Sequence, residues 1–343
     1  MTAKSRIDKK VAAVAARNTE PVLRKALLLR VADLRHVYRA PAVFVMVLAL
    51  VGISYSLDTP ILTAVMIAYL FGIMTYLAAR HEKEFDNLRR ILDVSDIVAD
   101  KVRHTFRHHS RAGLLMTWVV GIGLMIATNF SGPGLTGFRE GGQLTVSLVW
   151  GLLLAALFWV LACQMMLITY KNSRTFGKLG KDLTKIDLLD GPSLVPFARV
   201  GIRNLLIYFG AYTLLPLVLF DGAVYLPALL ISLIVTLPFA FLILLLPIIP
   251  VHEHVKREKR AELDRIQRAM HGDLAALDDS PIGMDTSDVG FTDLLLYRQM
   301  IQGVREWPVN TPVIARLAVY IVIPLLTWFG AAIVEHLVAQ YMS

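Results

Sequence analysis

Seven apolar runs, each about as long as a bilayer is thick, constrain this chain more than any other feature of its sequence. A hydrocarbon core of about 30 Å is crossed by roughly 20 residues of α-helix. Runs of this kind cover 41–57, 60–79, 113–130, 144–170, 205–220, 225–250 and 312–338. Within lipid, backbone polar groups must be paired inside the segment, so runs this continuous form helices. The sequence therefore predicts an all-α integral membrane protein with seven transmembrane helices.

The distribution of positive charge predicts how these helices are oriented. All but one of the 35 lysines and arginines lie in 1–40, 80–112, 171–203 and 251–316; the exception is Arg139. Lysine and arginine accumulate in cytoplasmic loops, so these four segments are predicted to be cytoplasmic. We expect a multi-pass protein of the bacterial cytoplasmic (inner) membrane, with its N-terminus inside and its C-terminus outside. The first run follows a long charged stretch rather than a short leader, so we expect it to be retained as a membrane span.

The cytoplasmic segments have amphipathic faces, which predict a layer of helical extensions. Three sets of apolar residues recur at the 3.6-residue helical period. They are Leu23, Leu27, Val31, Leu34 and Tyr38; Ile91, Val94, Val98, Val102 and Phe106; and Leu263, Ile266 and Met270. We expect the second and sixth spans to continue as helices into this layer.

These patterns divide the chain into four predicted parts. Residues 1–40 form a cytoplasmic amphipathic helix, and 41–250 hold the first six spans with long inner loops at 80–112 and 171–203. Residues 251–311 contain a cytoplasmic helix, an acidic mobile loop over 272–290 and a short helix over 291–304. Residues 312–343 form the seventh span and an outer C-terminus.

The net charge of +8 and the single cysteine, Cys163, exclude some classes of protein. A disulfide framework needs an even set of cysteines. Because the positive charge is spread over four segments beside membrane spans, it favours contact with anionic lipid over nucleic-acid binding. The partners we expect are the bilayer, further copies of the chain and a possible cytoplasmic protein.

Small residues at four-residue spacing mark two faces for close helix packing. They are Ala64, Ala68 and Gly72 in the second run, and Ser147, Gly151 and Ala155 in the fourth. Such faces let helix backbones approach closely in lipid. The partner helix could belong to the same chain or to a neighbouring copy.

The last run has one polar or small face and one apolar face. The first face is formed by Arg316, Tyr320, Pro324, Thr327, Ala331 and Glu335. Polar stripes on membrane helices face a partner helix or a water-filled path. Ordinary packing, with Arg316 and Glu335 at the two interfaces, is one interpretation, and a pore-facing surface is the other.

Histidines near the inner ends of the spans are candidates for a sensing role. His104 and His108 are four residues apart, and His252 and His254 flank Glu253. Histidine titrates near neutral pH and can ligate metals, although solvated or headgroup-facing histidines are the simpler and favoured interpretation. The chain has no metalloprotease, Walker A or Gly-x-Ser-x-Gly motif, so we expect neither a resident metal or cofactor nor an enzyme.

Two functions remain from these patterns. One is a homo-oligomeric channel with the polar face of the last run beside a central ion path. The other is a membrane scaffold or signalling protein whose basic cytoplasmic helices bind a partner or anionic lipid. In span order, rather than in residues, the chain is similar to the insect chemoreceptor channels, with seven spans, an inner N-terminus and a cytoplasmic helix before the last span. That similarity implies a homo-oligomer with the last span at the pore.

Overall fold

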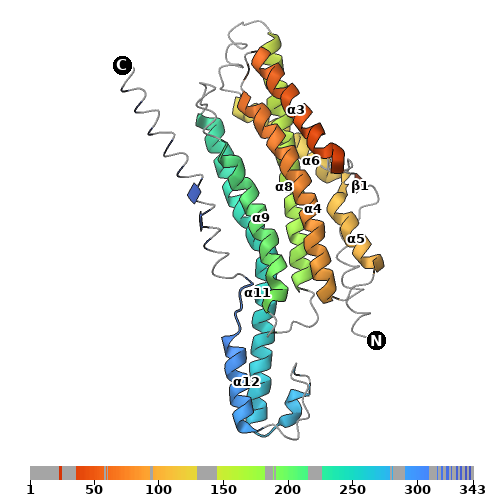
Figure 1. The fold of residues 1–343 in the computed structure, drawn as a ribbon, viewed down its shortest axis with the longest axis vertical. Helices are drawn as coiled ribbons and strands as arrows, with labels where there is room; N and C mark the ends of the chain where they lie inside the picture. Colours follow the sequence, from red (N-terminus) through yellow and green to blue (C-terminus); the bar gives the residue numbers. More distant parts are fainter. Residues whose placement is uncertain are drawn as a thin grey trace.

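The chain folds into an elongated helical bundle with a narrower helical extension at one end (Figure 1). The computed structural model describes residues 23–24, 36–57, 59, 61–92, 96–129, 145–181, 188, 191–214, 226–278, 280 and 290–308, with scattered positions between 315 and 340. The described residues are almost entirely helical. The all-α prediction is therefore confirmed for this part of the chain.

The first two apolar runs form a helical hairpin. It consists of α3 (His36–Ser56) and α4 (Ile61–Leu92), which pack against each other. At the turn, the Thr59 backbone N–H donates to the Ser54 carbonyl over 2.9 Å. Helix α4 continues past the apolar run that ends at 79, so its second half has the charged sequence predicted to lie in the cytoplasm.

The segment before the third run is divided rather than continuous. Helix α5 (Asp96–Arg107) is followed by the short strand β2 (His109–Ser110) and then by α6 (Arg111–Asn129). Strand β2 pairs antiparallel with β1 (Leu23–Arg24). The prediction of a helix through Leu23 is therefore wrong, because the backbone of β1 is paired with His109 and Ser110 instead. Most of the remaining face predicted within 1–40 lies outside the described residues.

Helices α8 (Val146–Lys181) and α9 (Val195–Tyr212) contain the fourth run and the start of the fifth. The 3₁₀ turn η1 (Gly191–Leu194) leads into α9. Helix α9 begins ten residues before the predicted span at 205, because Phe197 and Val200 are buried in the protein core. Proline in the first turn, Pro196, favours a helix start there since its missing N–H has no partner to lose.

Helix α11 (Leu226–Met270) contains the sixth run and continues far beyond it. Two residues after Met270 the chain leaves the helix through Gly272, whose φ of 100° is accessible to glycine. The Asp273 N–H bonds to the Arg268 carbonyl and the Gly272 N–H to the Ala269 carbonyl, which together form a Schellman motif.

The acidic segment predicted as a mobile loop begins with ordered structure. The 3₁₀ helix η3 (Leu274–Leu277) packs on α11 and buries Leu277. Residues 281–289 lie outside the described part of the chain. Helix α12 (Phe291–Gly303) then packs back along α11, which confirms the predicted short helix.

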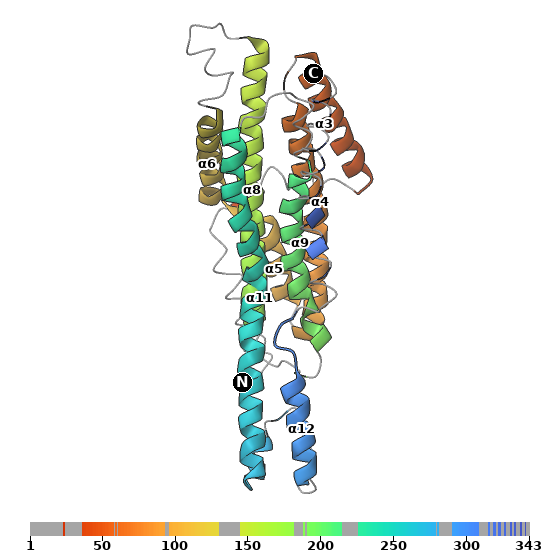
Figure 2. The ribbon, with the colours of Figure 1, turned by 90° about the vertical axis from the view of Figure 1, so that its left-hand side faces the viewer.

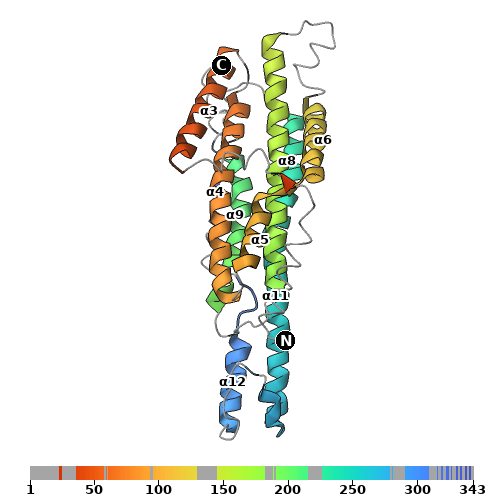
Figure 3. The same cartoon turned by 90° about the vertical axis from the view of Figure 1, so that its right-hand side faces the viewer.

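Four of the described helical segments are long and apolar enough to cross a membrane. They are Ile61–Arg89, Arg111–Asn129, Val146–Lys181 and Ile234–Met270; the apolar part Val45–Ser56 is shorter. Figures 2 and 3 show α3, α4 and α9 on one side of the bundle and α6, α8 and α11 on the other. Helix α12 lies beyond the bundle, beside the end of α11.

Exposed apolar side chains form a belt over α3, α6, α8 and α11. Val119 on α6 is 73% exposed and Ile234 on α11 is 70% exposed, and neighbours on α3, α6, α8 and α11 behave similarly. On α11 the exposed apolar side chains end at Ile249. Beyond that point the exposed positions are mainly charged or polar: Glu253, Arg257, Arg260, Asp264, Gln267 and Arg268. An apolar belt of this kind suits contact with lipid tails.

Glycines allow α11 to lie closely against its neighbours. A Cβ added to Gly201 of α9 would lie 2.5 Å from the Leu244 carbonyl oxygen, and one on Gly177 of α8 would collide with that of Leu246. By contrast, no described residue has an atom within 4 Å of a Cβ built on Gly72 or Gly151. The close approaches within this chain are therefore not at those two glycines of the predicted stripes.

The buried apolar residues form two separate clusters stacked along the bundle. One contains Ile67, Met74, Leu161 and Leu205 and lies within the apolar belt. The other contains Phe85, Phe176, Phe197, Val251 and Ile266 and extends toward α12. The side chains between these clusters are polar, and they form the site described next.

Candidate functional site

A chain of buried polar side chains joins α4, α8 and α9 between the two apolar clusters. His81 of α4 lies within 3.0 Å of Asn172 Nδ2 through its Nδ1 and within 3.1 Å of Asn204 Oδ1 through its Nε2. Asn204 Nδ2 donates to Ser173 Oγ over 2.8 Å. All four side chains are almost completely buried. The arrangement therefore satisfies polar groups that would be costly to bury alone.

The direction of these hydrogen bonds fixes one state of the histidine. Asn172 presents an amide N–H₂, so His81 Nδ1 must accept, and Asn204 presents a carbonyl oxygen, so His81 Nε2–H must donate. Both contacts are satisfied only by the neutral Nε2–H tautomer. A proton added at Nδ1 would face the Asn172 N–H₂ group, and the amide would have to rotate to accept it.

A buried ion pair lies one turn further along α4. Glu84 has a 4% exposed side chain and accepts from Arg203 Nη2 over 2.9 Å and from Arg199 Nη1 over 3.2 Å. Both arginines come from α9. Arg203 is 13% exposed and Arg199 is 51% exposed. Because α4 and α9 are joined by both the His81–Asn204 bond and this pair, the layer fixes their relative height.

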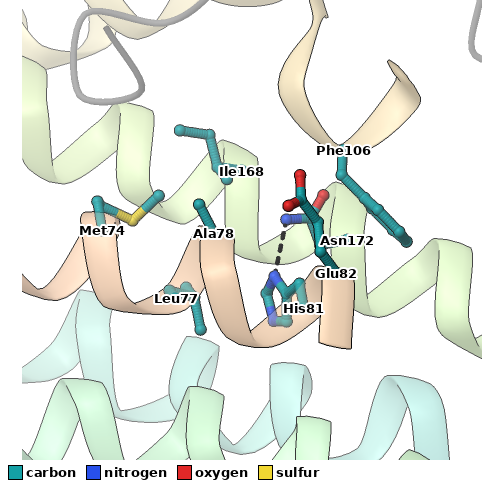
Figure 4. Close-up of a pocket in the computed structure, with 8 residues that line it drawn as sticks. All are labelled: Met74, Leu77, Ala78, His81, Glu82, Phe106, Ile168 and Asn172. Atoms are coloured by element: carbon teal, nitrogen blue, oxygen red, sulfur yellow. Dashed lines mark hydrogen bonds between the residues drawn. The ribbon is translucent and has the colours of Figure 1, made fainter. Parts of the chain in front are cut away.

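Aromatic rings enclose His81 on the side facing the second apolar cluster. Phe176 lies 5.8 Å and Phe106 lies 6.4 Å from the His81 ring, and the two phenyl rings stack at 5.4 Å. A small cavity with room for about one water molecule adjoins the histidine. Figure 4 shows its lining residues: Met74, Leu77, Ala78, His81, Glu82, Phe106, Ile168 and Asn172.

The depth of this layer coincides with the change from apolar to charged sequence on several helices. On α4 the change follows Ala79, on α8 it follows Tyr170, and on α9 the apolar stretch starts after Asn204. The hydrogen bonds above place these three transitions at one level. A common level is what a single membrane–water boundary would impose on antiparallel helices.

A second buried carboxylate joins the end of α11 to the segments that follow it. Glu262 of α11 is 1% exposed and accepts hydrogen bonds from Tyr297 of α12 over 2.9 Å and from Ser280. Arg265 neutralises its charge at 2.7 Å. The result is a fixed unit made of the end of α11, η3 and α12.

The end of α12 is attached to α11 by two further groups. Lys259 Nζ donates to the Gln302 and Val304 carbonyls over 2.9 and 2.8 Å. Helix ends expose unpaired carbonyls that a lysine satisfies well. The His252 ring stacks on Trp307 at 4.1 Å and donates through Nδ1 to the Glu306 carbonyl over 3.1 Å.

The predicted sensing histidines do not form one site. His104 and His108 of α5 stack face to face at 3.8 Å, and His108 Nδ1 donates to the His104 carbonyl. His252 faces Trp307, whereas His254 Nδ1 lies 3.4 Å from Arg257. In the described residues no group of three or more histidine, cysteine or carboxylate side chains could hold a metal ion.

The predicted pore-facing residues fall outside the part of the chain that the structure describes. This holds for Arg316, Tyr320, Pro324, Thr327, Ala331 and Glu335. The described positions of the same run, among them Val319, Leu326 and Ile333, are helical and exposed. These lie on the face that the sequence marked as apolar.

Sequence reasoning missed the polar layer as a site. Glu84 and Arg203 are 119 residues apart, so their pairing has no local signature. A usable signal was present nonetheless: His81, Asn172 and Asn204 each lie within two residues of one end of an apolar run. Comparison with protein-family models, with curated proteins and with solved structures finds no match to this chain.

Proposed function

We propose that this chain is a homo-oligomeric, channel-like protein of the cytoplasmic membrane. In this proposal it crosses the bilayer seven times with its N-terminus inside, and copies meet around a central ion path. The polar face of the last run, with Thr327 and Ala331 near its middle, borders that path. Four apolar helices and the exposed apolar belt support membrane insertion.

The observation that carries the proposed assembly is the exposed apolar face of α12. This helix buries Leu294, Tyr297 and Ile301 against α11. Its outer face leaves large apolar side chains uncovered: Phe291, Leu295, Leu296 and Met300, each between 43% and 60% exposed. Figure 1 places α12 at the opposite end of the molecule from α3, far from the apolar belt. Exposed apolar patches outside a membrane mark contact sites for other proteins.

A second copy of the chain suits this face. Helix α12 has one acidic residue, Asp293, and one basic residue, Arg298, so it has no net charge that would repel its own copy. The neighbouring exposed surface of α11 carries charges of both signs. A neutral apolar face is self-compatible in a way that a strongly charged face is not.

The filling of the single bundle also favours a path between copies. Among the described residues the two apolar clusters and the polar layer pack continuously, and the cavity beside His81 has room for about one water molecule. A conduction path through one bundle would need an open polar lumen. A path between subunits needs one modest helix face from each copy.

Native mass spectrometry of the full chain released from lipid nanodiscs tests the assembly. We expect a closed ring of three or more subunits for the native chain, and dissociation for Leu296→Asp and Met300→Asp. Gln299→Asp is the matched control, because it adds the same charge at an exposed polar position of α12. The proposal is contradicted if the native chain is a monomer, or if the oligomer dissociates to the same extent in all three variants.

Ion flux is measured next on the assembled protein. Thr327→Lys and Ala331→Trp should alter current or ion preference while leaving the subunit number unchanged. Val319→Trp, on the apolar face of the same run, is the control and should leave flux unaffected. If none of the three changes alters ion flux, the oligomer would stand, but the proposal that the last run borders the ion path would be wrong.

A scaffold is the second candidate, and it would use the same α12 face for a different cytoplasmic protein. The amphipathic face of Leu263, Ile266 and Met270 cannot serve as the docking face, because Ile266 is fully buried and Leu263 and Met270 pack against the same cluster of this chain. A strictly monomeric protein that loses a partner on Leu296→Asp, but not on Gln299→Asp, would favour the scaffold.

A further inference from the structure

Two arginines share one carboxylate at the inner edge of the apolar belt. Arg199 and Arg203 are one helical turn apart on α9, and both direct guanidinium nitrogens to Glu84 of α4. Two positive charges therefore face one negative charge. Among the described residues their ion pairs involve no carboxylate other than Glu84.

The more deeply placed arginine has donor capacity left over. A guanidinium has five N–H donors, and Arg203 uses Nη2 on Glu84. Its Nη1 is buried and has no hydrogen-bond partner among the residues that the structure describes. A buried charged donor without an acceptor is costly, so the local chemistry favours an additional acceptor with negative charge.

Access to this position comes through Arg199. Its side chain is 51% exposed, whereas those of Glu84 and Arg203 are nearly buried. An anion approaching from the surface would meet Arg199 first and Arg203 behind it. Planar guanidinium groups match the oxygens of a phosphate and bind it through paired hydrogen bonds.

The depth of the pair suggests where such a phosphate comes from. Arg203 immediately precedes the apolar part of α9, and Glu84 follows the apolar part of α4 by one turn and a half. This is the level at which basic side chains reach headgroups at a membrane surface. Phosphates of the lipid leaflet would therefore lie beside the arginines.

We propose that Arg199 and Arg203 form a binding site for a phosphate monoanion, supplied by the headgroup of an anionic phospholipid of the adjoining leaflet. Glu84 holds the two guanidinium groups in place and leaves one net positive charge for the ligand. The site is complete within a single copy, so it does not depend on the proposed channel function.

Lipid retention by the full chain tests the site. Native mass spectrometry is run on protein equilibrated with nanodiscs of phosphatidylglycerol in phosphatidylcholine. We expect Arg199→Gln to lower phosphatidylglycerol retention about five- to tenfold, as the loss of one basic group at a headgroup implies. Arg203 and Glu84 keep their pair in this variant, so the fold is preserved.

Arg80→Gln is the matched control. Arg80 lies on α4 near the same level and is exposed, and it stacks over Tyr76 rather than joining the Glu84 pair. It should change retention much less than Arg199→Gln. Equal losses in the two variants would mean general surface attraction and would overturn the proposed site, as would no loss in either.

Inorganic phosphate distinguishes the two sources of the anion. If the site takes a lipid headgroup, millimolar phosphate should leave phosphatidylglycerol retention nearly unchanged. If phosphate displaces the lipid from the native chain but has no such effect in Arg199→Gln, the site binds soluble phosphate and the lipid assignment is wrong. A melting temperature for each variant checks that folding is intact.

Discussion

At the scale of single residues, burial of ionisable groups is the main feature of this chain. His109 lies at the join between α5 and α6 with no exposed surface. Burial lowers the pKa of His109 to about 4, and the nearby positive charge of Lys171 acts in the same direction. The folded protein therefore holds this histidine neutral at neutral pH.

This burial predicts a specific dependence of stability on pH. Between pH 6.5 and about 4 the unfolded chain binds a proton at His109 and the folded chain does not. The free energy of unfolding should therefore fall as pH decreases through this window, by roughly 3 kcal/mol in total, and level off below it. Above pH 6.5 the full contribution of the neutral His109 to the free energy of unfolding is present.

Thermal unfolding of the native chain and of His109→Gln across pH 4–8 measures this effect. The difference between the two curves isolates His109 from other buried histidines such as His81. We expect the stability of the native chain, measured relative to that of His109→Gln, to fall toward low pH. Parallel curves would show that His109 is not held neutral by the fold.

The residues of the polar layer show what one sequence can and cannot predict. The apolar run predicted over 205–220 starts just after Arg203 and Asn204, and both residues lie on α9 at the start of its apolar part. Their partners on α4 and α8 could not be predicted, because hydrogen bonds between residues 31 to 123 positions apart depend on which helices are neighbours.

At the scale of helices, apolar length predicted where helices exist but not where they end. Helices α4 and α11 extend about 13 and 20 residues beyond their predicted spans. The ends are set by the apolar cluster that extends toward α12, in which Phe85, Leu88 and Val255 are buried. That cluster forms only when distant segments of the chain pack together. The sequence of a single apolar run therefore cannot predict where its helix ends.

Close packing of α11 against α9 gives a prediction at this scale. Gly201→Val should lower the melting temperature markedly, because its side chain would overlap the Leu244 carbonyl and contact Pro247. Overpacking of this kind costs about 1–3 kcal/mol or more. Gly151→Val is the control, since no described residue has an atom within 4 Å of a Cβ at that position, and it should leave the melting temperature nearly unchanged.

Solubilised protein followed by intrinsic fluorescence or scattering suffices for this comparison. Equal destabilisation by the two glycine substitutions would mean that helix propensity, rather than contact with α11, dominates. A large fall in melting temperature for Gly151→Val alone would point to a neighbouring copy packed on α8.

At the scale of the whole molecule, the two ends of the bundle should face opposite sides of a membrane. Cys163 is buried and is the only cysteine, so Cys163→Ala gives a background for single reporter cysteines. In intact cells, a membrane-impermeant maleimide should label Thr145→Cys but not Gln299→Cys. Both positions are exposed in the fold, so both should react after permeabilisation. Labelling of Gln299→Cys from outside would reverse the predicted orientation.

The length of α11 has a mechanical consequence. Its 45 residues, at 1.5 Å of rise each, make a rod of about 67 Å that begins within the apolar belt and ends beside α12. Glu262 and Lys259 tie α12 to that rod. Acting as a lever, α11 would convert a tilt of about 5° at one end into a displacement of about 6 Å at the other. Small changes in how the bundle sits in lipid would thereby move the contact face of α12 by more than the width of a side-chain contact.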